Sequence, residues 1–265
     1  MEADIAVIGG SGLYSLFDKH ESLDAKNKYG SASGTISVAE LEGKRVAFLP
    51  RHGNKHTIPP HKVPYRANIQ ALSELGVKMI IGTCAVGSLY SSYKPGDFVF
   101  FDQFANMTCG RDDTFFDEDE VVHVSMAYPY CDYMRRVAEE SSNRMNLSYH
   151  NTSTLAVVNG PRFSTVAESK LLMDNGFHCI NMTQYPEVAL AREKQICYLG
   201  VGVITDYDAG LVGKIIPVSF DEVNRVFAEN MVKLKGLIKE IVSGLNPEKR
   251  TCSCRNALDG AKVNV

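Results

Sequence analysis

The sequence lacks the features that would divide the chain or place it in a membrane. It contains no Pro/Gly/Ser-rich linker, low-complexity tract or internal repeat, and no apolar run reaches the length of a transmembrane helix. It also lacks excess positive charge, because 28 Lys and Arg stand against 31 Asp and Glu for a net charge of −3. Nucleic acid and anionic membranes are therefore not expected as partners. Residues 1–4 are acidic, whereas a secretory signal begins with basic residues, so we expect a cytoplasmic location.

Within this ordinary composition, 45% hydrophobic and 22% charged, apolar runs alternate with amphipathic segments. Strands are expected at residues 5–8, 35–41, 44–49, 78–83, 97–104, 154–158, 178–181 and 196–204. Helices are expected at residues 65–75, 130–143, 165–176 and 186–194, with the longest from 219 to 244. This alternation predicts an α/β fold: a single domain over residues 1–245 with a mixed central β-sheet flanked by α-helices, followed by a tail over residues 246–265.

The seven cysteines fall into two groups. Five are scattered, several of them in apolar strands, and are expected to be buried thiols: Cys84, Cys109, Cys131, Cys179 and Cys197. Cys252 and Cys254 form a Cys-x-Cys pair in the tail, which could be a redox pair, half of a metal site or a local disulfide. No second cysteine pair accompanies it in the sequence, so we expect no metal.

Two carboxylates, Asp206 and Asp208, directly follow the most apolar strand. Side chains at positions i and i+2 of an extended segment point the same way, and burial of like charges raises at least one pKa. Such a pair suits proton transfer or binding of the donor edge of a ligand. The alternative is a solvated loop with two ordinary aspartates.

Small and polar residues also follow other strands, where ligands of α/β proteins bind. Residues 9–12 read Gly-Gly-Ser-Gly, in which backbone N–H groups and Ser11 could bind an anion, or which could be a bare turn. The segment lacks the glycine spacing of a dinucleotide site and the Lys-Ser/Thr of a P-loop. Arg51 and His52 could donate to phosphate. His56 and His61 lie nearby, but the spacing fits no usual zinc pattern.

Two further strand ends complete the set. Residues 84–88, which include Cys84 and Ala85, are small enough to allow close backbone approach to a ligand, or they form a tight turn. Thr183 lies before an expected helix and could bind an anion there, although a helix-capping role is the ordinary alternative. Together these segments predict a phosphate-type site near an acid pair. Such a site suits a reaction with an anionic nucleophile and a leaving group that takes a proton.

The chain resembles the methylthioadenosine phosphorylases, in the trimeric branch of the purine nucleoside phosphorylase superfamily. The resemblance covers nearly the whole chain, from residues 8–12 to the Cys-x-Cys tail. The matching blocks, in order, are residues 51–53, 64–69, 87–89, 95–97, 102–104, 160–164, 181–183, 186–187 and 205–208. The resemblance implies a pentosyltransferase that uses inorganic phosphate as co-substrate, without cofactor or metal. Its products are adenine and 5-methylthioribose 1-phosphate, in purine and methionine salvage.

The resemblance also implies roles for individual residues. The residues implied to bind phosphate are Ser11, Arg51, His52, Cys84, Ala85 and Thr183. Asp206 would act at N7 of the purine and Asp208 at its 6-amino group. The residues implied to contact the nucleoside are Phe163 and Ser164 at the base, Met182 at the ribose, and Val218, Phe220 and Val223 at the 5′ group. His123 would reach the site of a neighbouring subunit in a homotrimer or a dimer of trimers.

Two alternatives remain from sequence alone. A phosphorylase that prefers a 6-oxopurine nucleoside, such as methylthioinosine or inosine, would use a similar site, although two ionised acceptors suit a 6-amino group better. A non-catalytic protein that binds purine nucleosides would need the same cavity but no acid with a raised pKa.

Overall fold

The computed structural model describes residues 1–10, 12–13, 20–210 and 217–263. Its main sheet consists of eleven described strands: β1 (Ile5–Gly9), β2 (Glu21–Leu23), β5 (Ile36–Leu41), β6 (Lys44–Pro50), β7 (Met79–Ser88), β8 (Phe98–Phe100), β9 (Gln103–Met107), β10 (Tyr149–His150), β11 (Thr154–Val158), β12 (Cys179–Asn181) and β13 (Cys197–Tyr207). A second, small sheet contains β3 (Lys26–Asn27) and β4 (Gly30–Ser31).

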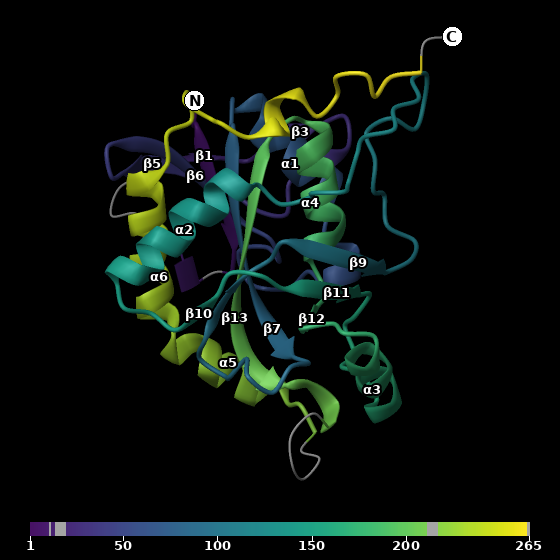
Figure 1. The fold of residues 1–265 in the computed structure, drawn as a ribbon. Coiled ribbons are helices and arrows are strands. Elements are labelled where there is room, and N and C mark those ends of the chain that lie inside the picture. The colour runs from purple at the N-terminus through teal and green to yellow at the C-terminus, as the bar shows by residue number, and fades with distance from the viewer. Residues whose placement is uncertain (11, 14–19, 211–216, 264–265) are drawn as a thin grey trace.

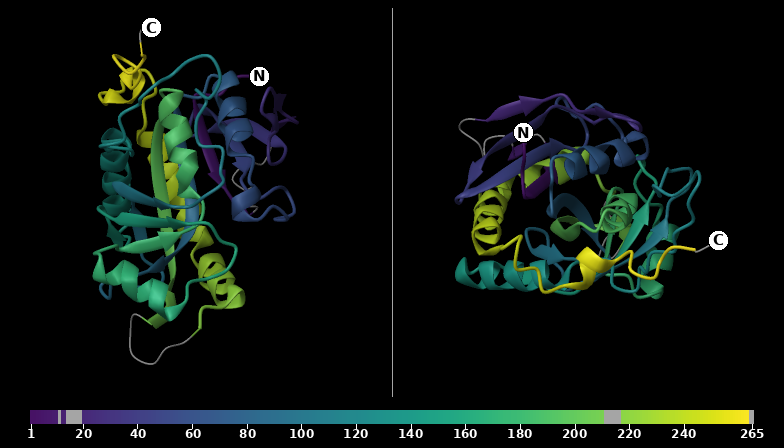
Figure 2. Two further views of the ribbon diagram at one scale, coloured as in Figure 1. Left: turned by 90° about the vertical axis from the view of Figure 1, so that its right-hand side faces the viewer. Right: turned by 90° about the horizontal axis from the view of Figure 1, so that it is seen from above.

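The helices among the described residues are α1 (Tyr65–Glu74), α2 (Asp132–Arg144), α3 (Val166–Asp174), α4 (Gln184–Glu193), α5 (Phe220–Glu229) and α6 (Met231–Gly244). Short 3₁₀ turns cover η2 (Pro60–Lys62), η3 (Asp208–Gly210) and η4 (Ser253–Asn256). Helices α2 and α6 lie side by side on one face of the sheet, and α1 and α4 pack together on the other (Figures 1 and 2). The predicted α/β fold with a mixed sheet flanked by helices is confirmed.

The sheet is mixed, and its main path runs in the order β10-β8-β13-β7-β1-β6-β5-β2. Strands β13, β7, β1 and β6 are parallel to one another, so their carboxyl ends meet at one edge. Strand β12 pairs antiparallel with β7 and brings β11 and β9 to the same region. Parallel strands need both faces covered by helices, which explains their nearly continuous apolar sequences.

Side chains of the central strands alternate between two hydrophobic cores. In β1, Ile5 and Val7 pack in the core beneath α2 and α6, whereas Ala6 and Ile8 pack in the core beneath α1 and α4. The same alternation continues in β13, where Leu199 faces the first of these cores and Tyr198 the second. The sheet is therefore fixed in register from both sides, which holds its carboxyl edge in place.

Local sequence signals set several turns and helix ends. The hairpin between β5 and β6 turns at Glu42 and Gly43, which have φ values of 51° and 70° and match the twist of a two-residue hairpin. Thr165 and Glu168 form a complete capping box at the start of α3. Ser219 caps α5 by accepting a hydrogen bond from the Glu222 backbone N–H, at 3.2 Å.

Two sequence predictions are wrong in detail. The single strand expected over residues 97–104 is two strands, β8 and β9, because the chain leaves β13 after Phe100 and pairs next with β11. The long helix expected from 219 to 244 is divided at Asn230 into α5 and α6. The Asn230 side chain donates to the Val226 carbonyl at 2.9 Å, a local hydrogen bond that competes with the regular helix.

After α6, the tail crosses the amino-terminal edge of the sheet, and its residues 261–263 lie beside residues 121–123 (Figure 1). The division of the chain at residue 245 stays a prediction. Cys84, Cys131, Cys179 and Cys197 are buried as expected, but Cys109 is exposed because it lies in the loop beyond β9. No helix in the described ranges is long and apolar enough to cross a membrane.

Candidate active site

A cavity of about 610 Å³ opens at the carboxyl edge of the parallel strands. Residues that follow β1 and β6, and residues 83–87 within β7, line one part of it, and the end of β13 lines another. The loop at 56–60, the segment at 160–164, the segment at 180–183 and helix α5 complete its wall. The cavity therefore lies where the topology of an α/β sheet predicts a ligand site.

Asp206 and Asp208 both line this cavity. Asp208 is 3% exposed and Asp206 is partly buried, so neither belongs to a solvated loop. Both pack over Gly87: a Cβ placed on Gly87 would lie 3.0 Å from Asp206 Oδ1 and 3.4 Å from Asp208 Cβ. The lack of a side chain at Gly87 thus makes room for the acid pair at the end of β13.

Burial changes the proton affinity of both carboxyl groups. Burial, and to a smaller extent the charge of Asp208, raises the pKa of Asp206 to about 6, although a 2.8 Å hydrogen bond from the Thr205 hydroxyl opposes this rise. Burial also raises the pKa of Asp208, against the effect of the nearby Ser164 and Ser169 hydroxyls. Asp206 therefore exchanges its proton near neutral pH, as a general acid requires.

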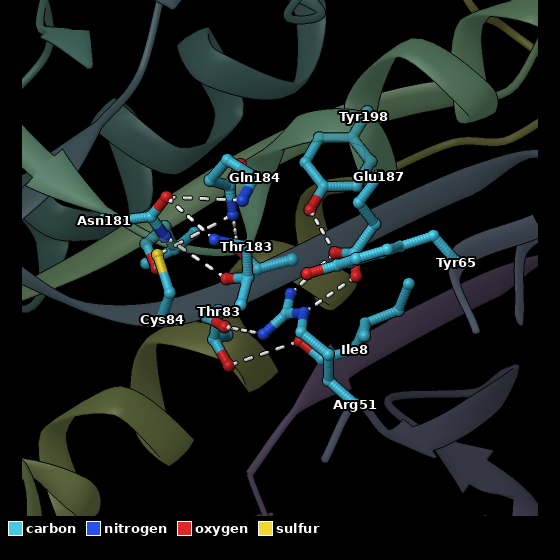
Figure 3. Close-up of polar contacts among 12 residues, drawn as sticks. Ile8, Arg51, Tyr65, Thr83, Cys84, Asn181, Thr183, Gln184, Glu187 and Tyr198 are labelled. Carbon is cyan, nitrogen blue, oxygen red and sulfur yellow. Dashed lines mark hydrogen bonds and ion pairs between the residues drawn. The ribbon is translucent and has the colours of Figure 1, made fainter. Parts of the chain in front are cut away.

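Arg51 also lines the cavity and forms a fully buried ion pair (Figure 3). Its guanidinium donates from Nε and Nη2 to the Glu187 carboxylate at 2.7 and 2.6 Å, and from Nη1 to the Thr83 carbonyl at 2.6 Å. Tyr198 donates to the same carboxylate at 2.6 Å. Burial opposes the charge of Arg51, but the attraction of Glu187 outweighs it and raises the pKa of Arg51. Arg51 therefore stays charged, and Glu187 fixes its orientation.

His52 follows Arg51 and also lines the cavity. Burial, and then the charge of Arg51, lower the pKa of His52 to about 4, so its imidazole is neutral at physiological pH. Its Nδ1 lies 2.9 Å from the Ile58 carbonyl, which only accepts hydrogen bonds. The proton therefore resides on Nδ1, and Nε2 is an acceptor. The sequence suggests His52 as a donor to phosphate. In this tautomer its free Nε2 instead accepts a hydrogen bond, so it suits a ligand oxygen that carries a proton.

The segment between β12 and α4 is ordered by Asn181 (Figure 3). The Asn181 Oδ1 accepts from the backbone N–H groups of Thr183 and Gln184 at 3.1 and 3.3 Å. Thr183 precedes α4 but makes no side-chain capping bond, so the capping alternative for its hydroxyl is wrong. Burial raises the pKa of the Cys84 thiol to about 12, so Cys84 is not a nucleophile at this site.

Arg111 supports the segment from the other side and was not identified from sequence. Its Nη2 donates to the Met182 carbonyl at 2.9 Å and to the Asn159 carbonyl at 3.1 Å, and its Nη1 donates to the Tyr185 carbonyl. Arg111 thus joins the end of β11 to the loop that carries Met182 and Thr183. No local pattern could have found it, because its partners lie 48 to 74 residues away in sequence.

Most of the predicted site residues meet in this one cavity. The predicted residues that line it are Arg51, His52, Cys84, Ala85, Phe163, Ser164, Met182, Thr183, Asp206, Asp208, Phe220 and Val223. Val218 is partly buried but does not line the cavity, and His123 is exposed on the surface away from it. Ser11 lies outside the described residues. Asn224 and Phe227 also line the cavity, and their helical spacing from Phe220 could have predicted this.

Comparison with known proteins agrees with this geometry. The Phosphorylase superfamily model matches residues 4–243. The chain belongs to this superfamily. S-methyl-5′-thioadenosine phosphorylase of Thermofilum pendens is 47% identical over 261 residues, covering 98% of each chain. The enzyme of the same name from Saccharolobus solfataricus is 46% identical over 267 residues, covering 99% of this chain and 98% of the relative.

Solved structures of the superfamily share the whole fold of this phosphorylase. A methylthioadenosine phosphorylase from an antarctic soil metagenomic library has a TM-score of 0.93 and 38% identity, covering 100% of this chain and 93% of that chain. Methylthioadenosine phosphorylase from Schistosoma mansoni, solved with adenine, has a TM-score of 0.93 and 30% identity, with 100% of both chains covered. Both comparisons confirm the predicted family and fold.

Proposed function

We propose that this phosphorylase uses inorganic phosphate to cleave the glycosidic bond of 5′-methylthioadenosine, giving adenine and 5-methylthioribose 1-phosphate. One observation carries the proposal: an acid whose pKa is raised to about 6, Asp206, lines the same cavity as Arg51 and Thr183. This combination offers a proton for the leaving base and donors for an oxyanion. The names of the similar proteins support the same reaction.

Phosphate is proposed to bind between the ends of β6, β7 and β12. The available donors are the Thr183 hydroxyl, the Ala85 backbone and two N–H groups of Arg51 beyond those bound to Glu187 and Thr83. The Nε2 of His52 would accept the proton of a monohydrogen phosphate ion. Ser11 is proposed to add its hydroxyl at the end of β1.

The purine is proposed to lie against Asp206, Asp208 and Phe163. Protonated Asp206 would donate to N7 as the base departs with developing negative charge. Asp208 would accept a hydrogen bond from the 6-amino group. One of its oxygens, Oδ2, is buried and has no hydrogen-bond partner among the described residues, which favours a ligand that carries a donor. Ser164 is proposed to bind the base beside Asp208.

The reaction breaks the C1′–N9 bond and forms a bond between C1′ and a phosphate oxygen. The transition state has oxocarbenium character, so a phosphate dianion held below the ribose stabilises its positive charge. Asp206 supplies the proton that N7 gains, and solvent later returns a proton to Asp206. Met182 is proposed to pack against the ribose and to hold C1′ in position.

The 5′ substituent is proposed to lie against helix α5. Phe220, Val223 and Phe227 line this part of the cavity, and their apolar surface favours a methylthio group over a hydroxyl group. Val218, which does not line the cavity in the isolated chain, is proposed to close over the substituent. The methylthio preference should appear as a lower KM for methylthioadenosine than for adenosine.

His123 is proposed to complete the site of a neighbouring subunit in a homotrimer, or in a dimer of trimers. It is exposed and lies outside the cavity of its own chain, which suits contact with a second copy. Sedimentation of a fully active monomer would contradict this assembly. Cytoplasmic location and a place in purine and methionine salvage stay predictions.

The test is product analysis with methylthioadenosine and methylthioinosine, each with and without phosphate. We expect adenine release that requires phosphate, and an Asp206→Ala variant that binds nucleoside but turns over far more slowly. Equal release without phosphate would indicate hydrolysis instead. Faster release of the base from methylthioinosine would favour a 6-oxopurine substrate, and binding without any turnover would favour a nucleoside-binding protein.

A further inference from the structure

Four cysteines that are far apart in sequence meet at the end of the sheet opposite the cavity. Cys131 precedes α2, and Cys197 is the first residue of β13. Cys252 and Cys254 come from the tail. We call these four residues the cysteine cluster. All four sulfur atoms lie within 4.8 Å of one another. Sequence analysis found no partner for the Cys-x-Cys pair because the other two cysteines are 55 or more residues away.

The spacing of the sulfur atoms fits a single tetrahedral metal ion. With a Zn–S distance of about 2.3 Å, the sulfurs of a tetrahedral site lie roughly 3.8 Å apart. The Cys197 and Cys252 sulfurs are 3.3 Å apart, and no sulfur of the cluster lies beyond 4.8 Å from another. Each sulfur therefore has three other sulfurs within 4.8 Å, and the 3.3 Å between the Cys197 and Cys252 sulfurs is longer than the S–S bond of about 2.05 Å in a disulfide.

The surroundings fit a closed structural site. Cys131, Cys197 and Cys254 belong to the hydrophobic core beneath α2 and α6, and Cys252 packs against it. None of the four lines the active-site cavity. The ligand set consists only of thiolates, which favour zinc over calcium or magnesium.

We propose that the cysteine cluster binds one Zn²⁺ ion, which fastens the C-terminal tail to the body of the enzyme. Binding would replace the four thiol protons with Zn²⁺ and release them to solvent, leaving a complex with two negative charges. Arg250 lies beside the cluster: its Nη1 is 3.4 Å from the Lys78 carbonyl, which also accepts the Cys197 backbone N–H at 3.0 Å. This cation offsets part of the charge.

The proposed ion would also stabilise contacts further along the tail. Beyond the cluster, Lys262 forms a β-bridge with Val122, and the Ala261 carbonyl accepts the His123 backbone N–H at 2.9 Å. These bonds hold the loop that carries His123. Since the tail beyond α6 contains only one short 3₁₀ turn and this isolated β-bridge among its described residues, a zinc crosslink would supply the rigidity that its own secondary structure does not.

The test starts with the full chain purified in reductant and without chelator, and its metal content is measured by mass spectrometry. We expect one zinc ion per chain, and loss of that zinc in a variant that combines Cys252→Ser with Cys254→Ser. The matched control is Cys109→Ser, because Cys109 is an exposed cysteine outside the cluster and its loss should leave the zinc in place.

Two measurements on the wild-type chain cover the case in which the double variant does not fold. Cobalt in place of zinc should give the intense visible bands and thiolate charge-transfer bands of a tetrahedral cysteine site. A strong chelator should make four further thiols reactive toward a thiol reagent, as many as the cluster contains. Purified chain that holds no zinc and has its cluster cysteines linked in disulfides would overturn the proposal. Zinc that persists in the double variant would overturn it equally.

Discussion

Replacement of Asp206 by Asn should make the folded protein more stable at neutral pH, even as it impairs the proposed reaction. The fold raises the pKa of Asp206 from 3.8 to about 6, because burial penalises the carboxylate. At about 1.4 kcal/mol per pKa unit, the charged form costs the folded state about 3 kcal/mol. Asparagine has nearly the same shape and carries no charge, so Asp206→Asn should recover up to that amount.

The pH dependence follows from the direction of this shift. Because the folded pKa lies above the unfolded one, the stabilisation from protonated Asp206 is fully present below about pH 3.8 and is lost as pH rises through about 6. The wild-type protein should therefore lose stability relative to Asp206→Asn across this window. Below it, the two proteins should differ little.

The assay is urea unfolding from pH 4 to pH 8 without phosphate or nucleoside, since either ligand would stabilise the folded state. The matched control is Asp174→Asn at the exposed end of α3, which makes the same substitution at a carboxylate outside the cavity. A stability difference for Asp206→Asn that stays constant from pH 4 to pH 8 would refute the reasoning. So would a variant that is less stable than wild type at pH 8.

Three further predictions concern the same site. Gly87→Ala should lower kcat/KM about 10- to 100-fold, because the alanine Cβ would lie 3.0 Å from Asp206 Oδ1 and displace that carboxyl group. Steady-state kinetics measure the loss, and circular dichroism checks that the fold is retained. Glu187→Gln should destabilise the protein by about 3 to 5 kcal/mol in urea unfolding, because it leaves the charge of Arg51 buried without its counter-ion. The Thr205 hydroxyl lowers the pKa of Asp206, so Thr205→Val should raise that pKa. In the pH profile of kcat/KM, the loss of activity at high pH should then begin at a higher pH than in wild type. An unchanged profile would exclude Asp206 as the titrating group.

Local patterns predicted much of the fold. The strand at 154–158 was placed at its observed bounds, and the starts of α3 and α5 follow the capping signals at Thr165 and Ser219. The apolar run before Asp206 was long enough to indicate a strand buried on both faces. These features depend on neighbouring residues along the chain, so one sequence contains the information that they need.

Features that depend on distant partners were not predictable in this way. Residues 97–104 have the composition of one strand, and only the change of partner from β13 to β11 divides them. Nothing in the sequence near Arg111 marks it, because its carbonyl partners at Asn159 and Met182 come from distant segments. The cysteine cluster likewise forms only when the tail folds back over the start of β13. In each case the sheet topology, rather than the local sequence, brings the groups together.

The electrostatics of the proposed phosphate site follow from one of these distant partners. The sequence suggested Arg51 as a donor to phosphate, but its charge is paired with the Glu187 carboxylate at 2.6 Å. His52 is neutral, because its pKa is lowered to about 4. Phosphate would therefore be held mainly by directed hydrogen bonds and would keep most of its negative charge. A strongly cationic site would bind phosphate more tightly but would weaken its attraction for the positive ribosyl group, on which the proposed transition state depends.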